Sequence, residues 1–406
     1  MSLQLLFQGI GTLFMQEPKF AIARLVLIAI GLSFVYLGYK GVLEGLIMIP
    51  MGFGMAGVNA GVLYFESGIN ATADGTGTLF LNPLISDPGD LVNIMQIDFL
   101  QPVYTLMFSN ALIACLVFMG VGVLADVSNV LRYPFTSMMI AMFAELGSVF
   151  TFPIAVWMGL DYGGAAAISI VGGADGPLVI FASLMLAPEL FVPITVIAYL
   201  YLSLTYGGYP FMIRAMVPQE LRGKAVKTAR GTPISPGAKI AFDIIACVIL
   251  SFLFPAAAPL LLSFFLGNAV KEAGLVKYTQ MIENVFLYVS TFFLGLLLGV
   301  LCEASTILNP TVLLFLILGV IALGVSGAGG IIGGYVVYFM SHKNFNPVIG
   351  VAGVSCVPTT AKVAQYQVAH VNKRVNIIQY AMGANICGVI TSAIITGIYI
   401  TLVPLL

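Results

Sequence analysis

The strongest candidate for chemistry is the run GGADGP at residues 172–177, which interrupts an apolar segment. Proline lacks a backbone N–H and glycine tolerates irregular backbone, so this run predicts a broken helix with free backbone carbonyls. Asp175 then lies among those oxygens, where an ionisable group is costly and normally functional. A carboxylate beside backbone carbonyls suits a hard cation such as Na⁺, or a proton. The alternative is an aspartate that only caps a structural kink.

A second polar interruption covers residues 346–358 and complements the first. It contains Asn346, Gly350 and Ser355 between prolines, which again predicts a break in a helix. Amide and hydroxyl oxygens are neutral ligands for Na⁺. Lys362 follows one helical turn after the last proline of this stretch. It would either bind an anion or extend its ammonium to the membrane interface, and the residues leave both roles open.

Three further polar side chains lie in apolar runs. Asn385 is surrounded by small residues that are typical of close helix packing. For the asparagine itself we predict a functional role. Tyr199 and Tyr201 belong to the run IAYLYLSLTY. A phenol at membrane depth relays a proton or donates a hydrogen bond, whereas an interfacial phenol belongs to an aromatic belt. The sequence alone leaves these two roles of the tyrosines open.

Four other acids lie in or near apolar segments: Glu145, Asp161, Asp243 and Glu303. We expect Asp161 and Glu303 at the ends of spans and Glu145 deeper in its segment.

The composition decides what kind of protein holds these residues. Of 406 residues, 60% are hydrophobic and 8% are charged. Soluble chains carry about 25% charged residues, so this chain cannot cover a soluble surface of its size. The composition excludes a soluble enzyme, a disordered chain and a nucleic-acid binder, and it predicts an all-α polytopic membrane protein.

Apolar segments long enough to cross a bilayer predict about nine to eleven spans, some of them broken or re-entrant. The candidate segments are 20–38, 42–63, 103–124, 135–158, 163–186, 190–213, 240–265, 285–301, 311–340, 346–366 and 375–404. Residues 1–18 predict an interfacial amphipathic helix, and no basic region marks a cleaved signal peptide.

Charge is distributed unevenly and predicts the topology. The loop 66–98 is acidic and is expected outside the cell, whereas 214–239 is basic and is expected in the cytoplasm. Pro and Gly in this basic segment indicate a linker between two transmembrane halves, 19–213 and 240–406.

The two halves carry a weak repeat: GVGVLADVSNVLRYP at 120–134 resembles GLLLGVLCEASTILNP at 295–310. VGGADGP at 171–177 corresponds in the same way to AGVSCVP at 352–358. Such similar, inverted halves are typical of transporters, whose sites lie at midplane helix breaks.

The chain resembles the β subunit of the bacterial sodium-pumping biotin-dependent decarboxylases, which act on oxaloacetate, methylmalonyl-CoA, glutaconyl-CoA or malonate. The motifs that carry the resemblance span almost the whole chain. They are LLFQGIGTL at 5–13, LIMIPMGFG at 46–54, GVGVLADVS at 120–128, GGADGP, NPVIGVAGVSCVP at 346–358 and MGANICGVITS at 382–392.

The resemblance implies a mechanism and partners. A carboxyltransferase subunit moves CO₂ onto biotin, and the β subunit decarboxylates carboxybiotin, exports Na⁺ and consumes a proton. This chain has no Met-Lys-Met biotin acceptor, so carboxybiotin must arrive on another subunit. The resemblance also implies a small membrane subunit and a homo-oligomeric arrangement within the complex. It places the chain in the lipid bilayer of a bacterial inner membrane and implies no nucleic-acid partner.

Matching motifs imply roles for particular residues. Asp175 takes the place of the family's essential aspartate, and the predicted Na⁺ ligands are Asp175, Asn346, Gly350, Ser355, Asn385 and Tyr201. Tyr201 is also implied in proton delivery and, with Asp175 and Lys362, forms the implied catalytic set. Lys362 is expected near the carboxybiotin.

Two departures from the family pattern affect this assignment. Lys362 stands where the family usually has arginine, so the charge remains but the bidentate fork for a carboxylate is lost. Glu145 stands at a position where glutamine is expected, which adds an ionisable group near the ion path. The run after Tyr201 also differs from the usual proline-containing one.

Other classes of protein fit part of this pattern. A stand-alone Na⁺/H⁺ antiporter or a Na⁺-coupled carboxylate transporter would also have broken helices and an intramembrane aspartate. A requirement for biotin and partner subunits distinguishes the decarboxylase from these carriers. A purely structural scaffold fits the buried polar residues least.

Overall fold

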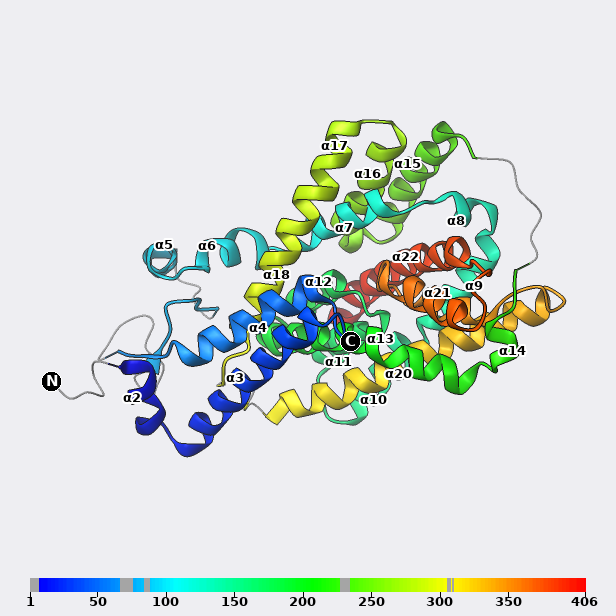
Figure 1. The fold of residues 1–406 in the computed structure, drawn as a ribbon. Helices are drawn as coiled ribbons and strands as arrows, with labels where there is room; N and C mark the ends of the chain where they lie inside the picture. Colours follow the sequence, from blue (N-terminus) through cyan, green and yellow to red (C-terminus); the bar gives the residue numbers. More distant parts are fainter. Residues whose placement is uncertain (1–6, 66–75, 84–87, 227–233, 305–307, 309) are drawn as a thin grey trace. The chain divides into compact units, whose positions relative to one another are not determined.

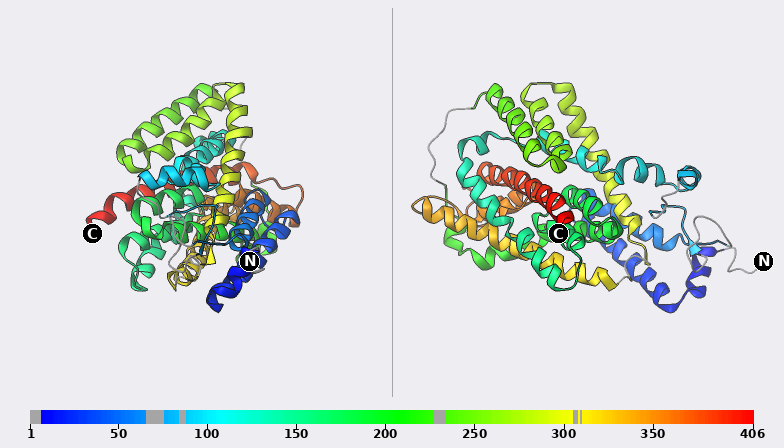
Figure 2. Two further views of the ribbon diagram at one scale, coloured as in Figure 1. Left: turned by 90° about the vertical axis from the view of Figure 1, so that its left-hand side faces the viewer. Right: turned by 180° about the vertical axis from the view of Figure 1, so that it is seen from behind.

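The computed structural model describes residues 7–65, 76–83, 88–226, 234–304, 308 and 310–406, with side chains at 88, 202–204 and 310 excepted. Almost all of this part is helical, and a two-residue antiparallel pair joins β1 (Leu63–Tyr64) to β2 (Thr76–Gly77). The chain forms two compact units, Met1–Ile113 with Val289–Leu314 and Ala114–Tyr288 with Phe315–Leu406. Each unit takes segments from both predicted halves, so the division at 214–239 stays a prediction. The elements of both units appear in Figures 1 and 2.

The apolar helices confirm the all-α membrane class. Six helices in the described part are long and apolar enough to cross a membrane, or eight if each bent pair is one span. Three shorter apolar helices lie among them. The six are α3 (Pro18–Tyr39), α9–α10 (Pro134–Trp157), α15 (Pro236–Leu253), α17–α18 (Val276–Leu301), Thr311–Met340 of α20 and Ile378–Leu405, which contains α22 (Ile378–Leu402).

One predicted span is wrong. Residues 240–265 form two helices instead of one, because α15 ends at Leu253 and Pro255 starts a short 3₁₀ turn. The chain then reverses into α16 (Ala258–Glu272), which packs against α15. Proline cannot continue the hydrogen-bond ladder of a helix, so the apolar run divides here.

In the first unit, a buried arginine holds the N-terminal helix α2 (Gln8–Met15) to the pair α3 and α4 (Gly45–Ala60). The side chain of Arg24 is only 2% exposed. It donates to the Asn59 carbonyl at 2.8 Å, to Thr12 Oγ1 at 3.1 Å and to Gln16 Oε1 at 2.8 Å. A helix was expected at this end of the chain and is present; its place at a membrane interface stays a prediction.

In the second unit, residues 162–186 form a hairpin that enters and leaves at one end. It consists of α11 (Tyr162–Ser169), a 3₁₀ turn (Ile170–Gly173) and α12 (Gly176–Leu186). A Cβ on Gly163 would lie 2.3 Å from the Leu186 carbonyl, so the two ends of the segment are neighbours. The predicted span 163–186 is therefore re-entrant, and the GGADGP run is its tip.

A second hairpin is built by a 3₁₀ helix (Pro347–Gly353) and α21 (Thr359–Val371). Both ends lie beside α14 (Gln219–Arg222) and the residues after it. Asn346 Nδ2 donates to the Arg222 and Lys224 carbonyls at 3.1 and 2.8 Å, and Asn372 Nδ2 donates to the Gly223 carbonyl at 3.4 Å. This segment also returns to the end from which it starts, so the predicted span 346–366 is re-entrant.

Longer helices enclose the two hairpins within this unit. They are α9 (Pro134–Ala144), α10 (Leu146–Trp157), α13 (Phe191–Met216), α20 (Pro310–Met340) and α22. Glycines allow the closest crossings: a Cβ on Gly350 would lie 2.0 Å from the Gly330 carbonyl, and one on Gly388 would lie 2.2 Å from the Gly353 carbonyl. Such small residues let backbones approach in membrane proteins, where apolar burial alone does not drive helix association.

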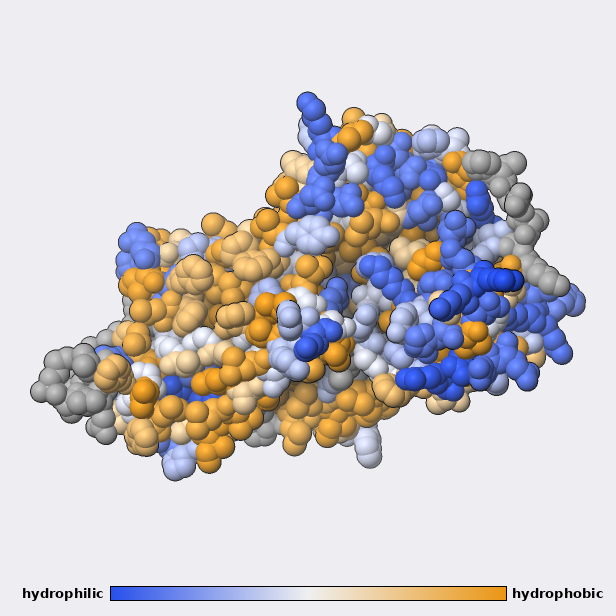
Figure 3. Space-filling model, in the orientation of Figure 1, coloured by the Kyte–Doolittle hydropathy of each residue, from blue (hydrophilic) through white to orange (hydrophobic). Residues whose placement is uncertain are grey.

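The end of this unit beside α14 is basic. On the face in Figure 3, polar side chains gather around α14 and the C-terminal end of α20. The basic residues near this end are Arg214, Arg222, Lys224, Lys343, Lys373 and Arg374. The opposite end, where α11 starts, has Asp161 as its helix cap.

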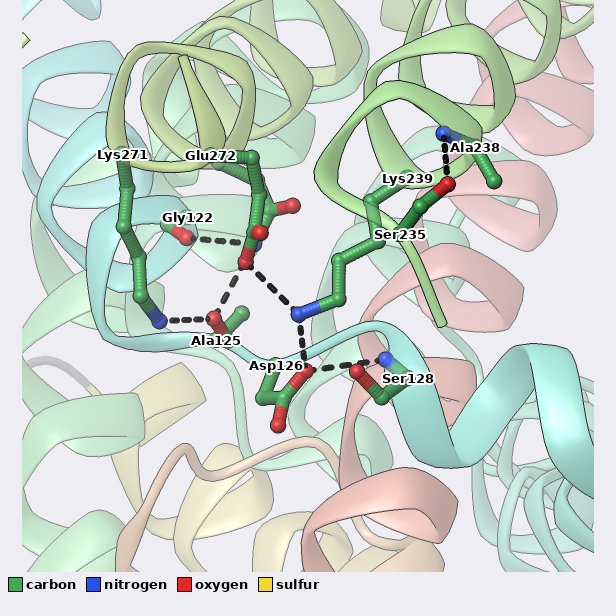
Figure 4. Close-up of polar contacts among 10 residues, drawn as sticks. Gly122, Ala125, Asp126, Ser128, Ser235, Ala238, Lys239, Lys271 and Glu272 are labelled. Carbon is green, nitrogen blue, oxygen red and sulfur yellow. Dashed lines mark hydrogen bonds and ion pairs between the residues drawn. The ribbon is translucent and has the colours of Figure 1, made fainter. Parts of the chain in front are cut away.

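The pair α15 and α16 is attached to the segment between α7 (Leu112–Leu124) and α8 (Ser128–Arg132) by charged side chains (Figure 4). Lys239 Nζ lies 3.1 Å from Asp126 Oδ1 and 3.0 Å from Glu272 Oε1. Lys271 Nζ donates to the Ala125 carbonyl at 2.6 Å. This network is polar and lies where the helices end.

Candidate functional site

The tips of the two hairpins meet. Ser355 donates to the Gly173 carbonyl twice, from its backbone N–H at 2.9 Å and from its hydroxyl at 2.6 Å. The GGADGP run and the matching run of the second half are therefore in contact, although 182 positions separate these two residues. Because the hairpins enter from opposite ends of the unit, the contact lies at its middle. This is the arrangement that broken helices produce in transporters.

Asp175 lies at the first tip, at the start of α12. Ala174 before it has a left-handed conformation, with φ of 53°, which turns the chain out of the 3₁₀ helix. The Asp175 carboxylate is 6% exposed and its Oδ1 accepts from the Leu178 N–H at 3.3 Å. The aspartate therefore caps a helix, which is the alternative role that the sequence analysis gave for this residue. The second carboxylate oxygen and the position beside the other tip leave it able to bind a cation.

The structure separates the two tyrosines by the face of α13 on which they lie. A Cβ on Gly176 would lie 2.4 Å from Tyr199 Oη, so this phenol is beside the residue that follows Asp175. Tyr199 is 1% exposed, and its hydroxyl has no hydrogen-bond partner among the described residues. Tyr201 instead donates to the Leu316 carbonyl of α20. Residues two apart on a helix point in different directions, so Tyr199 is the phenol at the Asp175 tip.

Asn385 supports the second tip from α22. Its Nδ2 donates to the Ala352 and Val354 carbonyls, each at 2.9 Å, and contacts Thr360 Oγ1 at 3.0 Å. The side chain is fully buried, and Oδ1 has no donor among the described residues. A buried acceptor without a donor is costly, and a cation would satisfy it.

Two other predicted ligands have packing or capping contacts. Asn346 Oδ1 accepts from the Val348 N–H at 3.0 Å, while its amide nitrogen binds the chain after α14. Asn346 and Ser355 lie at opposite ends of the 3₁₀ helix, whose seven residues span roughly 14 Å at 2.0 Å per residue. Gly350 lies against Gly330 of α20. The structure thus brings Asp175, Ser355 and Asn385 toward the meeting tips and leaves Asn346 near the basic end.

Lys362 lies on the exposed face of α21, with Tyr366 and His370 on the same face at steps of four residues. The rings of Tyr366 and His370 lie 4.5 Å apart between centroids. This stripe of Lys362, Tyr366 and His370 runs from near the second tip toward the basic end.

The sequence analysis did not predict Ser392 as a site residue, and it placed Glu145 only near the ion path. Glu145 is 2% exposed and lies at the joint of α9 and α10. Its Oε2 accepts from Ser148 Oγ at 2.8 Å, and its Oε1 accepts from Ser392 Oγ. Ser392 Oγ lies 3.0 Å from Ser355 Oγ. The only sequence signal for Ser392 was its position in the MGANICGVITS motif.

The fold and this site define a class of protein: a multi-pass membrane protein in which two opposed re-entrant hairpins meet at a buried centre rich in oxygen atoms. Carboxylates, hydroxyls, an amide oxygen and backbone carbonyls are the ligands of hard cations. Such a centre can take up and release monovalent ions between the two hairpins.

Comparison with known proteins identifies the family. The family described as Na⁺-transporting oxaloacetate decarboxylase beta subunit matches residues 23–403. A carboxybiotin decarboxylase of Malonomonas rubra is 51% identical over 401 residues, covering 99% of this chain and 98% of the relative. The oxaloacetate decarboxylase beta chain of Haemophilus ducreyi is 30% identical and covers 97% of each chain. The methylmalonyl-CoA decarboxylase subunit beta of Propionigenium modestum is also 30% identical, covering 93% of this chain and 94% of the relative.

The chain therefore belongs to the family of decarboxylase beta subunits. The resemblance of the sequence motifs to this family is confirmed.

Proposed function

We propose that this chain is the membrane subunit of a sodium-pumping decarboxylase in a bacterial inner membrane. It decarboxylates carboxybiotin presented by a partner subunit and couples this reaction to Na⁺ export and proton consumption. Carboxyltransferase and biotin-carrier subunits and a small membrane subunit are the proposed partners. The observation that supports the proposal most is the contact between Ser355 and the Gly173 carbonyl, because it joins the two hairpin tips beside Asp175.

Na⁺ is the proposed cargo, and three side chains are its proposed ligands at the tips: Asp175, Ser355 and Asn385. The donorless Oδ1 of Asn385 supports this choice because a cation would satisfy it. Tyr199 joins them as the phenol beside Asp175. Asn346 and Gly350 contribute by holding the second hairpin in place, and Tyr201 remains a candidate for proton delivery through its place on α13.

Carboxybiotin is proposed to dock at the basic end and reach the stripe of Lys362, Tyr366 and His370. The positive-inside rule favours this end as the cytoplasmic one. A lysine ammonium stabilises the carboxylate of carboxybiotin as a point charge. When the N–C bond breaks, CO₂ leaves and the ring nitrogen takes a proton, so a proton supplied from the ion path completes the reaction.

The energetics allow such coupling. Moving one charge outward costs about 2.3 kcal/mol per 100 mV, and a tenfold Na⁺ gradient adds about 1.4 kcal/mol. In an alternating cycle, ionised Asp175 binds Na⁺ from the cytoplasm, and protonation of the site then releases Na⁺ outward. Because the proton replaces Na⁺ at the same oxygens, protonation of the site and release of Na⁺ occur together.

Replacement of Asp175 by asparagine tests the proposal. We expect Asp175→Asn to abolish Na⁺-stimulated decarboxylation of free carboxybiotin while leaving assembly with partner subunits intact, because asparagine caps a helix as well as aspartate does. The measurement is turnover against Na⁺ concentration in the purified complex. Asp161→Asn is the matched control, since Asp161 is an exposed helix cap at the entrance of the same hairpin.

Two results would contradict the proposal. Sodium-stimulated turnover by Asp175→Asn would remove Asp175 from the ion site. Uptake of ²²Na⁺ by this chain alone in vesicles, combined with no decarboxylation by an intact complex, would favour a Na⁺/H⁺ antiporter or a Na⁺-coupled carboxylate transporter instead.

A further inference from the structure

A cavity in the first unit lies between α2, α3 and α4. Its volume is about 270 Å³, just below the roughly 300 Å³ at which small-molecule sites begin. The polar residues Arg24 and Asn59 line it together with four apolar side chains, those of Phe7, Ile10, Leu13 and Ile28. This mixed lining suits an amphiphile, a molecule with one polar and one apolar end.

The guanidinium of Arg24 is held in this wall by neutral acceptors. Four of its five N–H groups donate to the carbonyls of Asn59 and Gly9, to Thr12 Oγ1 and to Gln16 Oε1. No carboxylate oxygen of the described residues lies within 4.0 Å of it, and Glu303 attracts it from a greater distance. A charge in apolar surroundings is costly, so an anion that reaches the fifth N–H would stabilise this arginine.

The first turn of α2 supplies further donors at the same cavity. The backbone N–H groups of Gln8 and Gly9 have no acceptor among the described residues, and no side chain caps this end of the helix. Both residues line the cavity, and the contact from Arg24 to the Gly9 carbonyl places the guanidinium beside this turn. Helix N-termini bind phosphate through such N–H groups. Arg24 and this turn therefore offer donors to one anionic group.

The cavity opens on an apolar outer surface. Phe7 and Ile10 in its lining are 55% and 61% exposed, and only 17% of the most apolar stretch of α3 is buried. From the nearby end of α4 the chain continues to the acidic segment 66–98, which is expected outside the cell. The molecules that meet such a surface are the phospholipids of the outer leaflet, and these carry a phosphate next to acyl chains.

We propose that this cavity binds an anionic phospholipid, with its phosphate at Arg24 and the first turn of α2 and an acyl chain along Leu13 and Ile28. A headgroup of net negative charge is favoured, because the ammonium of phosphatidylethanolamine would add a second positive charge beside Arg24. The bound lipid holds α2 to α3 and α4, so its binding stabilises the folded protein.

The test uses the purified complex in detergent, stripped of lipid and titrated with phosphatidylglycerol. Native mass spectrometry counts the lipid that stays bound, and thermal unfolding follows the stabilisation. We expect one tightly bound phosphatidylglycerol per chain and a melting temperature that rises with lipid concentration and saturates. Phosphatidylethanolamine should bind about tenfold more weakly, and inorganic phosphate alone should leave the melting temperature unchanged.

Arg24→Gln removes the charge from the cavity. We expect phosphatidylglycerol to bind this variant about tenfold more weakly, because a charge-assisted hydrogen bond to the phosphate is lost. Lys40→Gln is the matched control, since Lys40 is an exposed basic residue at the other end of α3, and it should leave lipid binding unchanged.

A second variant keeps the proposal testable if Arg24→Gln does not fold. Ile28→Phe fills the apolar part of the cavity and leaves Arg24 in place. We expect it to lose the bound phosphatidylglycerol while the lipid-free protein keeps its melting temperature. Val26→Phe is the control, because Val26 is 50% exposed on the same helix and lies outside the cavity lining.

Three results would overturn the proposal. Equal weakening of lipid binding in Arg24→Gln and Lys40→Gln would mean unspecific attraction between charges. Full stabilisation by inorganic phosphate would mean an anion site without a lipid. Absence of bound phosphatidylglycerol, together with loss of the small membrane subunit from the Ile28→Phe complex, would assign the cavity to a partner helix.

Discussion

At the scale of one residue, the surroundings of Asp175 suit the Na⁺ site that we propose. The carboxylate lies at the N-terminus of α12, whose backbone N–H groups carry partial positive charge. These groups stabilise the ionised carboxylate when no cation is bound. The carbonyl of Gly173, at the end of the preceding 3₁₀ turn, offers negative charge instead. Opposite helix ends therefore meet at the tip, and in the proposed cycle they keep the carboxylate available while Na⁺ binds and leaves.

The two tyrosines of α13 permit a direct comparison. Tyr199→Phe removes the partnerless hydroxyl beside Asp175, so we expect a weaker Na⁺ dependence and little change in stability. Tyr201→Phe removes the hydrogen bond to Leu316, so we expect about 1 kcal/mol less stability and a retained Na⁺ dependence. Turnover against Na⁺ and thermal unfolding in detergent measure both effects. A loss of Na⁺ dependence confined to Tyr201→Phe would instead support the role implied by the family motif.

Gly176 tests how closely the tip fits against Tyr199. A Cβ there would lie 2.2 Å from Tyr199 Cζ, so Gly176→Ala must displace the ring or the tip. We expect loss of Na⁺-stimulated turnover and a destabilisation of about 1–3 kcal/mol from overpacking. Gly208→Ala in α13 is the control, because nothing lies within 4 Å of its added Cβ. Equal effects of the two substitutions would mean that the packing at Gly176 has no particular importance.

At the scale of elements, each re-entrant hairpin is positioned at its ends and at its tip. The first is closed by Gly163 against Leu186 and the second by the chain after α14, while Ser355 joins the tips. Buried backbone groups at the breaks must find partners within the protein, since lipid offers none. The contacts from Ser355 and Asn385 satisfy carbonyls at the tips and fix the hairpins together.

The charged network in Figure 4 predicts how the pair α15 and α16 responds to pH. Partial burial tends to raise the pKa of Asp126, but hydrogen bonds from Ser128 and Lys239 outweigh it and hold this pKa below its usual value. The stabilisation is therefore present at neutral pH and is lost as the pH falls through the lowered pKa. Because the Asp126 side chain is 52% exposed, Asp126→Asn should cost only about 0.2–1 kcal/mol at pH 7.

Thermal unfolding at pH 7 and at progressively more acidic pH measures this effect, and the difference between Asp126→Asn and the wild type should shrink in acid. Lys239→Met should destabilise more, because Glu272 is 9% exposed and would lose its partner. A difference between Asp126→Asn and the wild type that stays constant down to acidic pH would contradict the role of ionised Asp126.

At the scale of the whole molecule, we propose an ion site, and the part of the chain that the structure describes has little other catalytic equipment. It lacks its own biotin acceptor, and the relatives are named as beta chains or a beta subunit. A complete complex is therefore expected to turn over its acyl substrate, and in our proposal this chain acts on the carboxybiotin that a partner subunit presents.

Avidin distinguishes these two activities. We expect avidin to block turnover of the acyl substrate by the complete complex, because it binds the biotin on the carrier subunit. Decarboxylation of added free carboxybiotin should continue and remain saturable in Na⁺. The measurement compares both activities in one preparation with and without avidin. Insensitivity of acyl-substrate turnover to avidin would contradict the dependence on a biotin-carrying partner.

The sequence by itself determined the features that depend on local composition and local breaks. The scarcity of charge required a membrane protein, and glycine with proline at 172–177 and 346–358 required broken helices, because neither residue type sustains a regular helix there. Asp175 was predicted as a cation ligand from the residues because it lies in the first of these breaks.

The tertiary structure decided which of these polar groups meet. Glu145 and Ser392 are 247 positions apart, and their contact depends on how α9, α10 and α22 cross. The choice of Tyr199 over Tyr201 as the neighbour of Asp175 depends on the rotation of α13 about its own axis. The apolar sequence around both tyrosines does not specify this rotation. The position of Asn346 depends on the path of the second hairpin. Side-chain partners across a helical membrane protein follow from packing between distant segments, and spacing along one chain does not encode that packing.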